Sequence, residues 1–255
     1  MKKSVLAIGG TSSDGCAGVL MDARVIASFG LNPACAVTAI TAQNTKGVRS
    51  VFIPPAKVVR EQLDAIFSDL DIAAVKIGML GSETVAGAVL DELRARSAKN
   101  VVLDPVMNAQ SDGSSLYEGE MGTLKALASV STMITPNAGE AKALVKVEVG
   151  DVGSAKSACA ALLKTGARAV LLKSVPMDRG RIADAYAERR TFRLFEKQMV
   201  RTTTHGGGCA LASAIAANLA LGRKPAEAAV AAERLMARLV AKTERVGNGV
   251  RCVSP

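Results

Sequence analysis

The sequence predicts an α/β fold whose doubly wound, mainly parallel sheet is flanked by helices. Short apolar segments alternate with amphipathic segments of helical spacing along most of the 255 residues, and repeated strand–helix order is typical of parallel sheets. Hydrophobic residues make up 49% of the chain and tryptophan is absent, so the core is aliphatic, as buried parallel strands require. This length suits one core, and we predict a single domain over residues 1–255.

The first half of the chain contains four predicted strands separated by helices. Each strand is a short run of aliphatic residues, whereas the apolar positions of the helices recur with helical spacing. A proline pair at 54–55 opens one helix, because proline is favoured in a first helical turn. The predicted elements are a strand at 5–8, a helix at 17–29, a strand at 34–42, a helix from 54–55, a strand at 74–77, a helix at 83–96 and a strand at 101–103.

The order changes in the second half, where a predicted hairpin separates two groups of elements. Residues 181–200 have the pattern of antiparallel strands. Before them we expect a strand at 133–135, a helix from about 139, a helix at 154–165 and a strand at 169–173. Two helices follow, the first built of small residues from 206–208 to 221 and the second from 225 to about 242.

Charge, hydropathy and cysteines argue against several classes of protein. The net charge is +9, but the basic residues are spread without a run of five and only 3% of residues are aromatic, so no nucleic-acid partner is expected. The first apolar stretch ends at Ile8, too early for an export signal, and no apolar run approaches the roughly 18 residues of a membrane span. Five scattered cysteines indicate free thiols in a reducing cytoplasm and no structural zinc.

The strongest indication of a functional site is the sequence THGGGC at residues 204–209, which precedes the helix of small residues. Gly206, Gly207 and Gly208 let a ligand approach the backbone, and N–H groups at a helix start bind anions such as a transferring phosphoryl group. A glycine turn before a buried helix is an equally good interpretation. Cys209 lies in the first helical turn, where the dipole lowers a thiol pKa; it either takes a proton from a substrate alcohol or is an inert packed cysteine.

Acidic side chains follow two predicted strands, at the edge of the sheet where ligands bind in open α/β folds. Asp104 follows the strand at 101–103, and Asn137 and Glu140 follow the strand at 133–135. Oxygen ligands from Asp104 and Glu140, with phosphates and water, suit Mg²⁺. A helix cap or a solvated charge is the alternative for each acid. Lys173 ends another strand, where its ammonium is placed to meet a phosphate.

The glycine-rich segment GGTSSDGCAG at residues 9–18 follows the first strand but matches no common nucleotide-binding motif. It has neither the P-loop pattern nor a clear dinucleotide fingerprint, so phosphate binding by a Walker loop is excluded. His205 is the one histidine of the chain. We expect it to order the glycine turn through hydrogen bonds rather than to act as a general base.

Together these segments resemble the hydroxymethylpyrimidine/phosphomethylpyrimidine kinase family of the ribokinase superfamily. The resemblance rests on AGVLMDARVIASFG, TAQNTKGV, VKIGMLGS, NVVLDPVM, ITPNAGEA and THGGGCALASAIAANLALG, which occur in the family's order from about residue 5 to residue 225. It implies a ribokinase-like fold, ATP with Mg²⁺, and phosphorylation of 4-amino-5-hydroxymethyl-2-methylpyrimidine and/or its monophosphate in thiamine biosynthesis. It also makes a homodimer reasonable.

The resemblance further implies a role for each matching residue. Gln43 resembles the side chain that hydrogen-bonds the pyrimidine, whose ring is lined by Gly10, Met79 and Val106. Cys209 resembles the cysteine that replaces the usual ribokinase aspartate base. The other implied roles are the anion hole for Gly206, Gly207 and Gly208, magnesium for Asp104 and Glu140, and cofactor binding for Asn137, Lys173 and Thr204, with Lys173 meeting the nucleotide phosphates.

Several departures from the family pattern leave the substrate open. In the segment 9–18, Ser12 replaces an acid, Asp14 appears two residues later and Cys16 replaces a glycine. Elsewhere Leu20 and Gln110 replace a glutamine and a lysine, residues 174–176 replace two glycines and a histidine, and Gly207 replaces a threonine. The alternatives are a kinase for a pyridoxal-like or modified pyrimidine alcohol and a catalytically weakened sensor of a thiamine precursor. A nucleic-acid role ranks last.

Overall fold

A nine-stranded sheet forms the centre of the protein in a computed structural model that describes residues 1–109, 112–199 and 204–255. Its strands are β1 (Ser4–Ser12), β2 (Asn32–Asn44), β3 (Gly47–Phe52), β4 (Ile72–Ile77), β6 (Val101–Leu103), β8 (Met133–Ile134), β9 (Ala169–Pro176), β10 (Arg181–Glu188) and β11 (Thr191–Gln198). They lie in the order β11-β10-β9-β8-β6-β4-β1-β2-β3. Neighbours from β9 to β2 are parallel, whereas β3, β10 and β11 pair antiparallel. The predicted mainly parallel sheet is confirmed.

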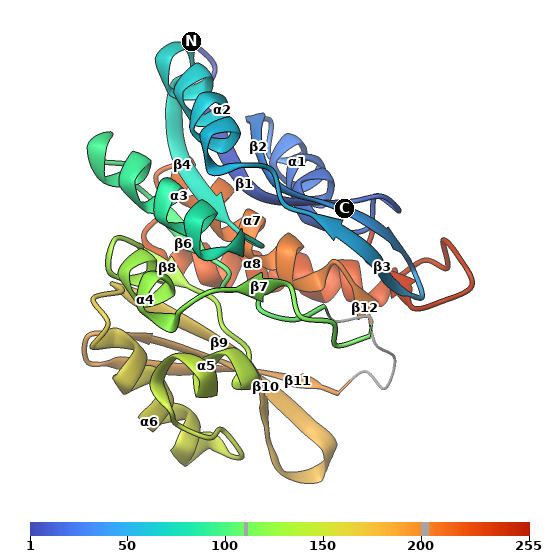
Figure 1. The fold of residues 1–255 in the computed structure, drawn as a ribbon. Helices are drawn as coiled ribbons and strands as arrows, with labels where there is room; N and C mark the ends of the chain where they lie inside the picture. Colours follow the sequence, from blue (N-terminus) through green and yellow to red (C-terminus); the bar gives the residue numbers. More distant parts are fainter. Residues whose placement is uncertain (110–111, 200–203) are drawn as a thin grey trace.

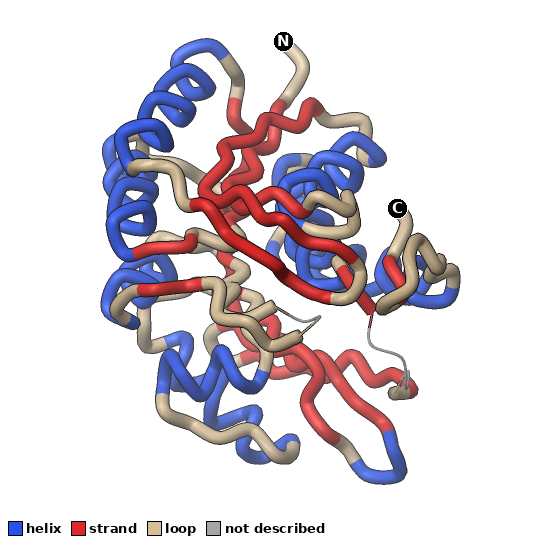
Figure 2. The backbone as a smooth tube through the Cα atoms, turned by 45° about the vertical axis from the view of Figure 1, so that its right-hand side comes forward, coloured by secondary structure: helices blue, strands red, loops and turns tan. Residues whose placement is uncertain are grey.

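Helices cover both faces of this sheet (Figures 1 and 2). One face carries α1 (Gly18–Ser28), α7 (Gly207–Ala220) and α8 (Pro225–Ala241), which share an aliphatic core with the strands. The other carries α2 (Ala56–Asp69), α3 (Glu83–Ala95), α4 (Met121–Ser129), α5 (Ala138–Val145) and α6 (Val152–Leu163) over a second core. Within the described ranges, no helix is both long and apolar enough to cross a membrane.

The elements predicted from the sequence are all present, including the hairpin of β10 and β11, but several short ones were not predicted. The edge strand β3 has no buried side chain, so it carries no hydrophobic pattern that marks a strand. The others are α4, a single 3₁₀ turn at Asp178–Gly180, and the short strands β5 (Gly81–Ser82), β7 (Tyr117–Glu118), β12 (Thr204–His205) and β13 (Arg251–Cys252). A strand of two residues is held by its neighbours, and its own sequence gives no periodic signal.

The chain reverses direction across the sheet next to β1, which lies between β2 and β4 although β4 comes later in the sequence. At such a switch point the loops after neighbouring strands separate and leave a crevice at their carboxyl ends. The helix α7 packs beside these strands, and all eleven of its residues from 210 to 220 are buried. Its small side chains let it lie in the middle of the protein with its amino terminus at the same edge as the crevice.

Candidate functional site

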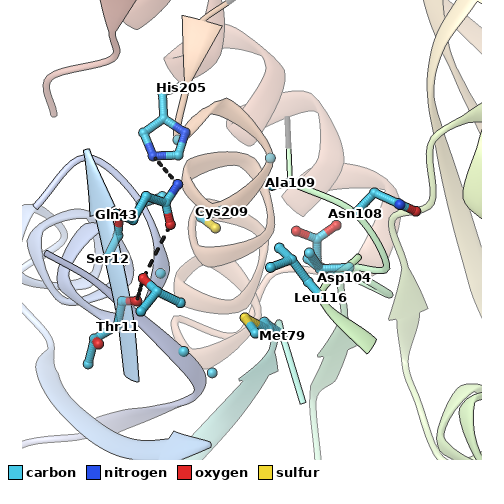
Figure 3. Close-up of a pocket in the computed structure, with 18 of the residues that line it drawn as sticks. Thr11, Ser12, Gln43, Met79, Asp104, Asn108, Ala109, Leu116, His205 and Cys209 are labelled. Atoms are coloured by element: carbon cyan, nitrogen blue, oxygen red, sulfur yellow. Dashed lines mark hydrogen bonds between the residues drawn. The ribbon is translucent and has the colours of Figure 1, made fainter. Parts of the chain in front are cut away.

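Two hollows lie at the carboxyl ends of the strands, and both are lined by Lys173 and Gly208. We call the first the inner cavity (Figure 3). Its walls include Gly10, Thr11, Ser12, Thr41, Gln43, Lys76, Met79, Asp104, Val106, Asn108, Glu140, His205, Gly206 and Cys209. The second, the outer groove, has a volume of about 750 Å³ and is lined by Asn137, Ser174, Asp184, Lys197, Thr204, Gly207 and Glu233 among others.

Every site residue predicted from the sequence lies at one of these two hollows. The predicted ring-binding residues Gly10, Gln43, Met79 and Val106 all line the inner cavity, as do both predicted magnesium ligands. The predicted cofactor-binding residues Asn137, Lys173 and Thr204 all line the outer groove. The glycines and Cys209 lie where the hollows meet. Gln110, one of the departures from the family pattern, lies outside the described residues. The roles of all these residues remain predictions.

The glycine turn before α7 has one position that only glycine fits. Gly206 is the N-cap and has a φ of +83°, and a Cβ there would overlap the carbonyl oxygen of Cys16. A Cβ on Gly207 would meet nothing closer than Met236 Cε and Thr204 Oγ1, both at 3.8 Å, so this position tolerates a Cβ. The first N–H groups of an α-helix have no partner inside the helix. The turn therefore presents backbone donors between the two hollows.

Cys209 is half-buried in the first turn of α7 and lies near the backbone of Gly18. Burial raises the pKa of this thiol, and the Lys76 ammonium is the main influence that opposes the rise. The expectation that the helix dipole leaves Cys209 with a lowered pKa is therefore wrong, because desolvation outweighs the favourable charges. The neutral thiol is the stable form in this structure.

The Lys173 ammonium is held by the two predicted magnesium ligands. Its Nζ lies 2.6 Å from Asp104 Oδ1 and 3.9 Å from Glu140 Oε2. Thr135 Oγ1 donates to the same Asp104 oxygen at 3.1 Å. Burial alone would lower the pKa of Lys173, but the two carboxylates raise it above its ordinary range. The lysine therefore stays charged at the junction, where it faces both hollows.

Asn137 and Glu140 have a structural role as well as a place at the site. They form the capping box of α5, with Asn137 N donating to Glu140 Oε2 at 2.7 Å and Glu140 N donating to Asn137 Oδ1 at 2.9 Å. The helix-cap alternative is thus correct for Glu140. Burial raises the pKa of Glu140 to about 7, while Lys173 opposes this rise.

The carboxylates fit Mg²⁺ bound together with phosphates. Among the described residues, Asp104 Oδ2 and Glu140 Oε1 have no hydrogen-bond partner, so each acid keeps one oxygen for a cation. The same residues contain no cluster of three or more acidic, histidine or cysteine side chains that could hold a metal alone. Mg²⁺ commonly binds through one or two carboxylates, with phosphates and water completing its shell.

A buried ion pair beside Cys209 was not singled out from the sequence. Lys76 Nζ lies 2.8 Å from Asp22 Oδ2, with exposed side-chain fractions of 1% and 0%. The other Asp22 oxygen accepts a hydrogen bond from Ser213 of α7 at 2.8 Å. Lys76 also lines the inner cavity. The available signal was a lysine inside the otherwise apolar strand IAAVKI, because an unpaired lysine is almost never buried.

Gln43 and His205 meet at the opposite wall of the inner cavity from Asp104 (Figure 3). Their Nε2 atoms lie 3.2 Å apart, and His205 Nε2 is 3.7 Å from Asp14 Oδ2. Burial lowers the pKa of His205, so its neutral form is favoured, although Asp14 opposes the shift. His205 contacts a predicted substrate-binding side chain, which is more than the backbone-ordering role expected from the sequence.

The sequence that forms this site matches a known family over almost its whole length. The model of the family described as phosphomethylpyrimidine kinase matches residues 12–254. The chain belongs to this family. Among the curated members of the phosphomethylpyrimidine kinase family, the hydroxymethylpyrimidine/phosphomethylpyrimidine kinase of Rhizobium meliloti is 36% identical over 252 residues, covering 98% of this chain and 94% of that protein.

Solved structures confirm the ribokinase-like fold of this family member. The phosphomethylpyrimidine kinase from Clostridium difficile has a TM-score of 0.82 and 30% identity, covering 94% of this chain and 100% of that chain. The pyridoxal kinase from Staphylococcus aureus in complex with AMP-PCP and pyridoxal has a TM-score of 0.89 and 26% identity, covering 100% of this chain and 93% of that chain. The phosphomethylpyrimidine kinase family thus shares its architecture with kinases of another ring alcohol.

Proposed function

We propose that this protein transfers the γ-phosphoryl group of ATP to 4-amino-5-hydroxymethyl-2-methylpyrimidine, to its monophosphate, or to both, in thiamine biosynthesis. The observation that carries the proposal is that the inner cavity and the outer groove share Lys173 and Gly208. A ring alcohol in the cavity and a nucleotide in the groove would meet at the glycine turn. The complex of a related kinase with an ATP analogue and a ring alcohol supports this division.

The residues at the junction have separate roles in the proposed reaction. The N–H groups of Gly206–Gly208 stabilise the charge of the transferring phosphoryl group, and Lys173 binds the nucleotide phosphates. The substrate oxygen forms its bond to phosphorus as the bond to ADP breaks. The hydroxyl proton passes to the sulfur of Cys209, which accepts it as a thiolate favoured by Lys76. Because burial raises the pKa of this thiol, turnover of the alcohol rises with pH.

Mg²⁺ is part of the proposal, held by Asp104 and Glu140 through their uncommitted oxygens together with the nucleotide phosphates. When bound, the ion neutralises phosphate charge during the transfer. Lys173 contacts both acids, so it holds their carboxylates at the junction before the nucleotide binds.

The deciding experiment follows ADP release with ATP, Mg²⁺ and hydroxymethylpyrimidine and identifies the product by mass. A product heavier by one phosphoryl group, and then by a second, supports the proposal. Cys209→Ala is the matched variant, expected to lower kcat far more than it changes KM. Ring binding without ADP release would instead identify a ligand sensor and would refute the proposed reaction.

A kinase for a pyridoxal-like alcohol is the second candidate. It is favoured by the likeness to the Staphylococcus aureus pyridoxal kinase. It is also favoured by Ser12, which lines the inner cavity and replaces an acid of the family pattern. A substrate panel with the wild type and with Ser12→Asp separates the two candidates. Faster turnover of pyridoxal than of the pyrimidine by the wild type, reversed in the variant, would establish the second.

We further propose that the protein is a homodimer in the cytoplasm. The β2–β3 edge of the sheet supports the dimer, since Ile40, Val51 and Phe52 expose 52%, 38% and 60% of their surface there. Five free cysteines support a reducing compartment. Light scattering of the wild type and of Phe52→Asp tests the dimer, and a wild-type monomer at micromolar concentration would refute it.

A further inference from the structure

Asp14 lies in the glycine-rich segment at residues 9–18, and only one of its two carboxylate oxygens accepts hydrogen bonds from the described residues. Its Oδ1 accepts hydrogen bonds from Ser12 Oγ at 2.6 Å and from Cys16 N at 3.0 Å. Its Oδ2 is buried and has no hydrogen-bond partner in the described part of the chain. The side chain is 8% exposed, and this free oxygen lies 3.7 Å from His205 Nε2. A buried carboxylate oxygen without a donor is costly, so the site is built for a donor that this state does not supply.

The contact between Gln43 and His205 fixes which way the Gln43 carboxamide faces. An amide nitrogen can only donate, so the 3.2 Å contact makes His205 Nε2 an acceptor with its proton on Nδ1. Gln43 Oε1 then points away from His205. Gln43 Oε1 lies 3.3 Å from Thr41 Oγ1, but the single hydroxyl proton of Thr41 is given to Thr11 O at 2.6 Å. Gln43 Oε1 is therefore an acceptor free to bind a ligand in the inner cavity.

We propose that Asp14 and His205 are positioning residues that turn the Gln43 carboxamide and thereby select the ring. With neutral His205, the cavity offers Gln43 Oε1 and favours a ring alcohol that carries an N–H donor, such as an exocyclic amine. A ring that presents an anionic oxygen, such as the phenolate of pyridoxal, is disfavoured. The inference rests on the proposed function and deepens it, because it names what distinguishes the two candidate substrates.

Protonation of His205 reverses this preference. A proton on Nε2 faces the amide protons of Gln43, so the carboxamide turns over and its Oε1 accepts from the imidazolium. The free Oδ2 of Asp14 stabilises the new charge, and Gln43 Nε2 becomes a donor in the cavity. The cavity then favours a ring with an anionic oxygen.

Two thiols face His205 from neighbouring segments, while Glu140, whose pKa burial raises to about 7, lies with Lys173 and Asp104 and is common to both proteins of the test below. Cys252 pairs with His205 in the strand register, and its thiol interacts with that of Cys16. Burial raises the pKa of both thiols, that of Cys16 to about 12, so they stay neutral. Arg24 is the cation near both thiols, and its charge opposes the rise of their pKa values.

The test measures binding, so that it does not depend on catalysis. Calorimetry gives the Kd of the aminopyrimidine alcohol and of pyridoxal between pH 5.5 and 8.5, for the wild type and for Asp14→Asn. We expect the wild-type preference for the aminopyrimidine to fall by about 10- to 100-fold at the acidic end, as for loss of one buried hydrogen bond. In Asp14→Asn the fall moves to lower pH or disappears. Protonation of the free ligands changes the Kd equally for both proteins, so it cancels when the wild type is compared with Asp14→Asn.

The single histidine allows a direct second measurement. In ¹⁵N spectra of the imidazole, the wild type should carry its proton on Nδ1 at pH 8, and its titration midpoint should drop in Asp14→Asn. An Nε2–H tautomer at pH 8, an identical pH dependence in both proteins, or binding of neither ring overturns the inference. Ring binding with the expected pH dependence but without ADP release refutes the proposed function and leaves the inference standing.

Discussion

Replacing Gly206 by alanine tests the glycine turn, with Gly207→Ala as the matched neighbour. Gly206 has a φ of +83°, which costs a residue with a Cβ about 1–2 kcal/mol. The new Cβ would also overlap the Cys16 carbonyl oxygen, and relieving such overpacking costs about 1–3 kcal/mol more. Gly206→Ala should thus lose about 2–5 kcal/mol of unfolding free energy. At Gly207 the nearest atoms to a Cβ are 3.8 Å away, so alanine should gain about 0.5–1 kcal/mol in the helix.

Urea unfolding of both variants measures the difference directly, and steady-state kinetics adds the functional consequence. If the turn is displaced, its backbone N–H groups move away from the transferring phosphoryl group, so kcat of Gly206→Ala should fall by about 100- to 1000-fold. The fall in Gly207→Ala should be far smaller. Equal stability of the two variants would refute the steric reasoning. A stable Gly206→Ala with normal kcat would refute the role of the turn.

Three further predictions concern buried charges and the thiol. Lys76→Met leaves the Asp22 carboxylate, which is 0% exposed, without its partner, so urea unfolding should show a loss of about 3–5 kcal/mol in stability. The double variant Lys76→Met/Asp22→Leu should recover part of this loss. An unchanged unfolding midpoint in Lys76→Met would contradict the prediction. Burial raises the pKa of Glu233 from 4.5 to about 8, so its contribution to stability is present below pH 4.5 and is lost as pH rises through about 8. Glu233→Gln should flatten that decline in melts recorded from pH 4 to 9, and parallel curves would disprove the assignment. Cys209→Ala should lower kcat at least about 100-fold and abolish its rise with pH, and a retained rise would assign the titration to another group.

The sequence was sufficient for most of the fold because the buried parallel strands are short aliphatic runs and most of the helices carry a helical hydrophobic period, although α4 was missed. The edge strand β3 lacks such a period and was missed, since its pairing with β2 supplies its stability. A strand-end position also placed Asp104 correctly, whereas Lys173, predicted to end a strand at 169–173, lies inside β9, which continues to Pro176. Their 2.6 Å contact joins residues 69 positions apart, and the Gln43–His205 contact spans 162 positions. Contacts of that kind depend on loop geometry, which no local pattern in one sequence encodes.

The pKa of Cys209 and the role of Glu140 could not be predicted from the sequence. A cysteine in a first helical turn suggests a lowered pKa, but desolvation depends on the atoms that surround the thiol. Glu140 shows the same limit, because its spacing from Asn137 is equally that of a capping box and of a ligand pair. The structure supports both interpretations of Glu140, since capping uses one oxygen and leaves the other free.

The all-round burial of α7 restricts how this protein can evolve. Every residue from 210 to 220 is enclosed, so a larger side chain there would press on the strands or on α1 and α8. The helix behind the glycine turn therefore has few viable substitutions. The loop at 11–16 lies against the glycine turn, since a Cβ on Gly206 would overlap the Cys16 carbonyl oxygen, and in this loop Ser13 is exposed whereas the Asp14 side chain is buried. Ser12 and Cys16, which depart from the family pattern, are buried and are linked through Asp14, so a new residue at either position must fit a filled space, and the exposed Ser13 is the position of this loop with the most room.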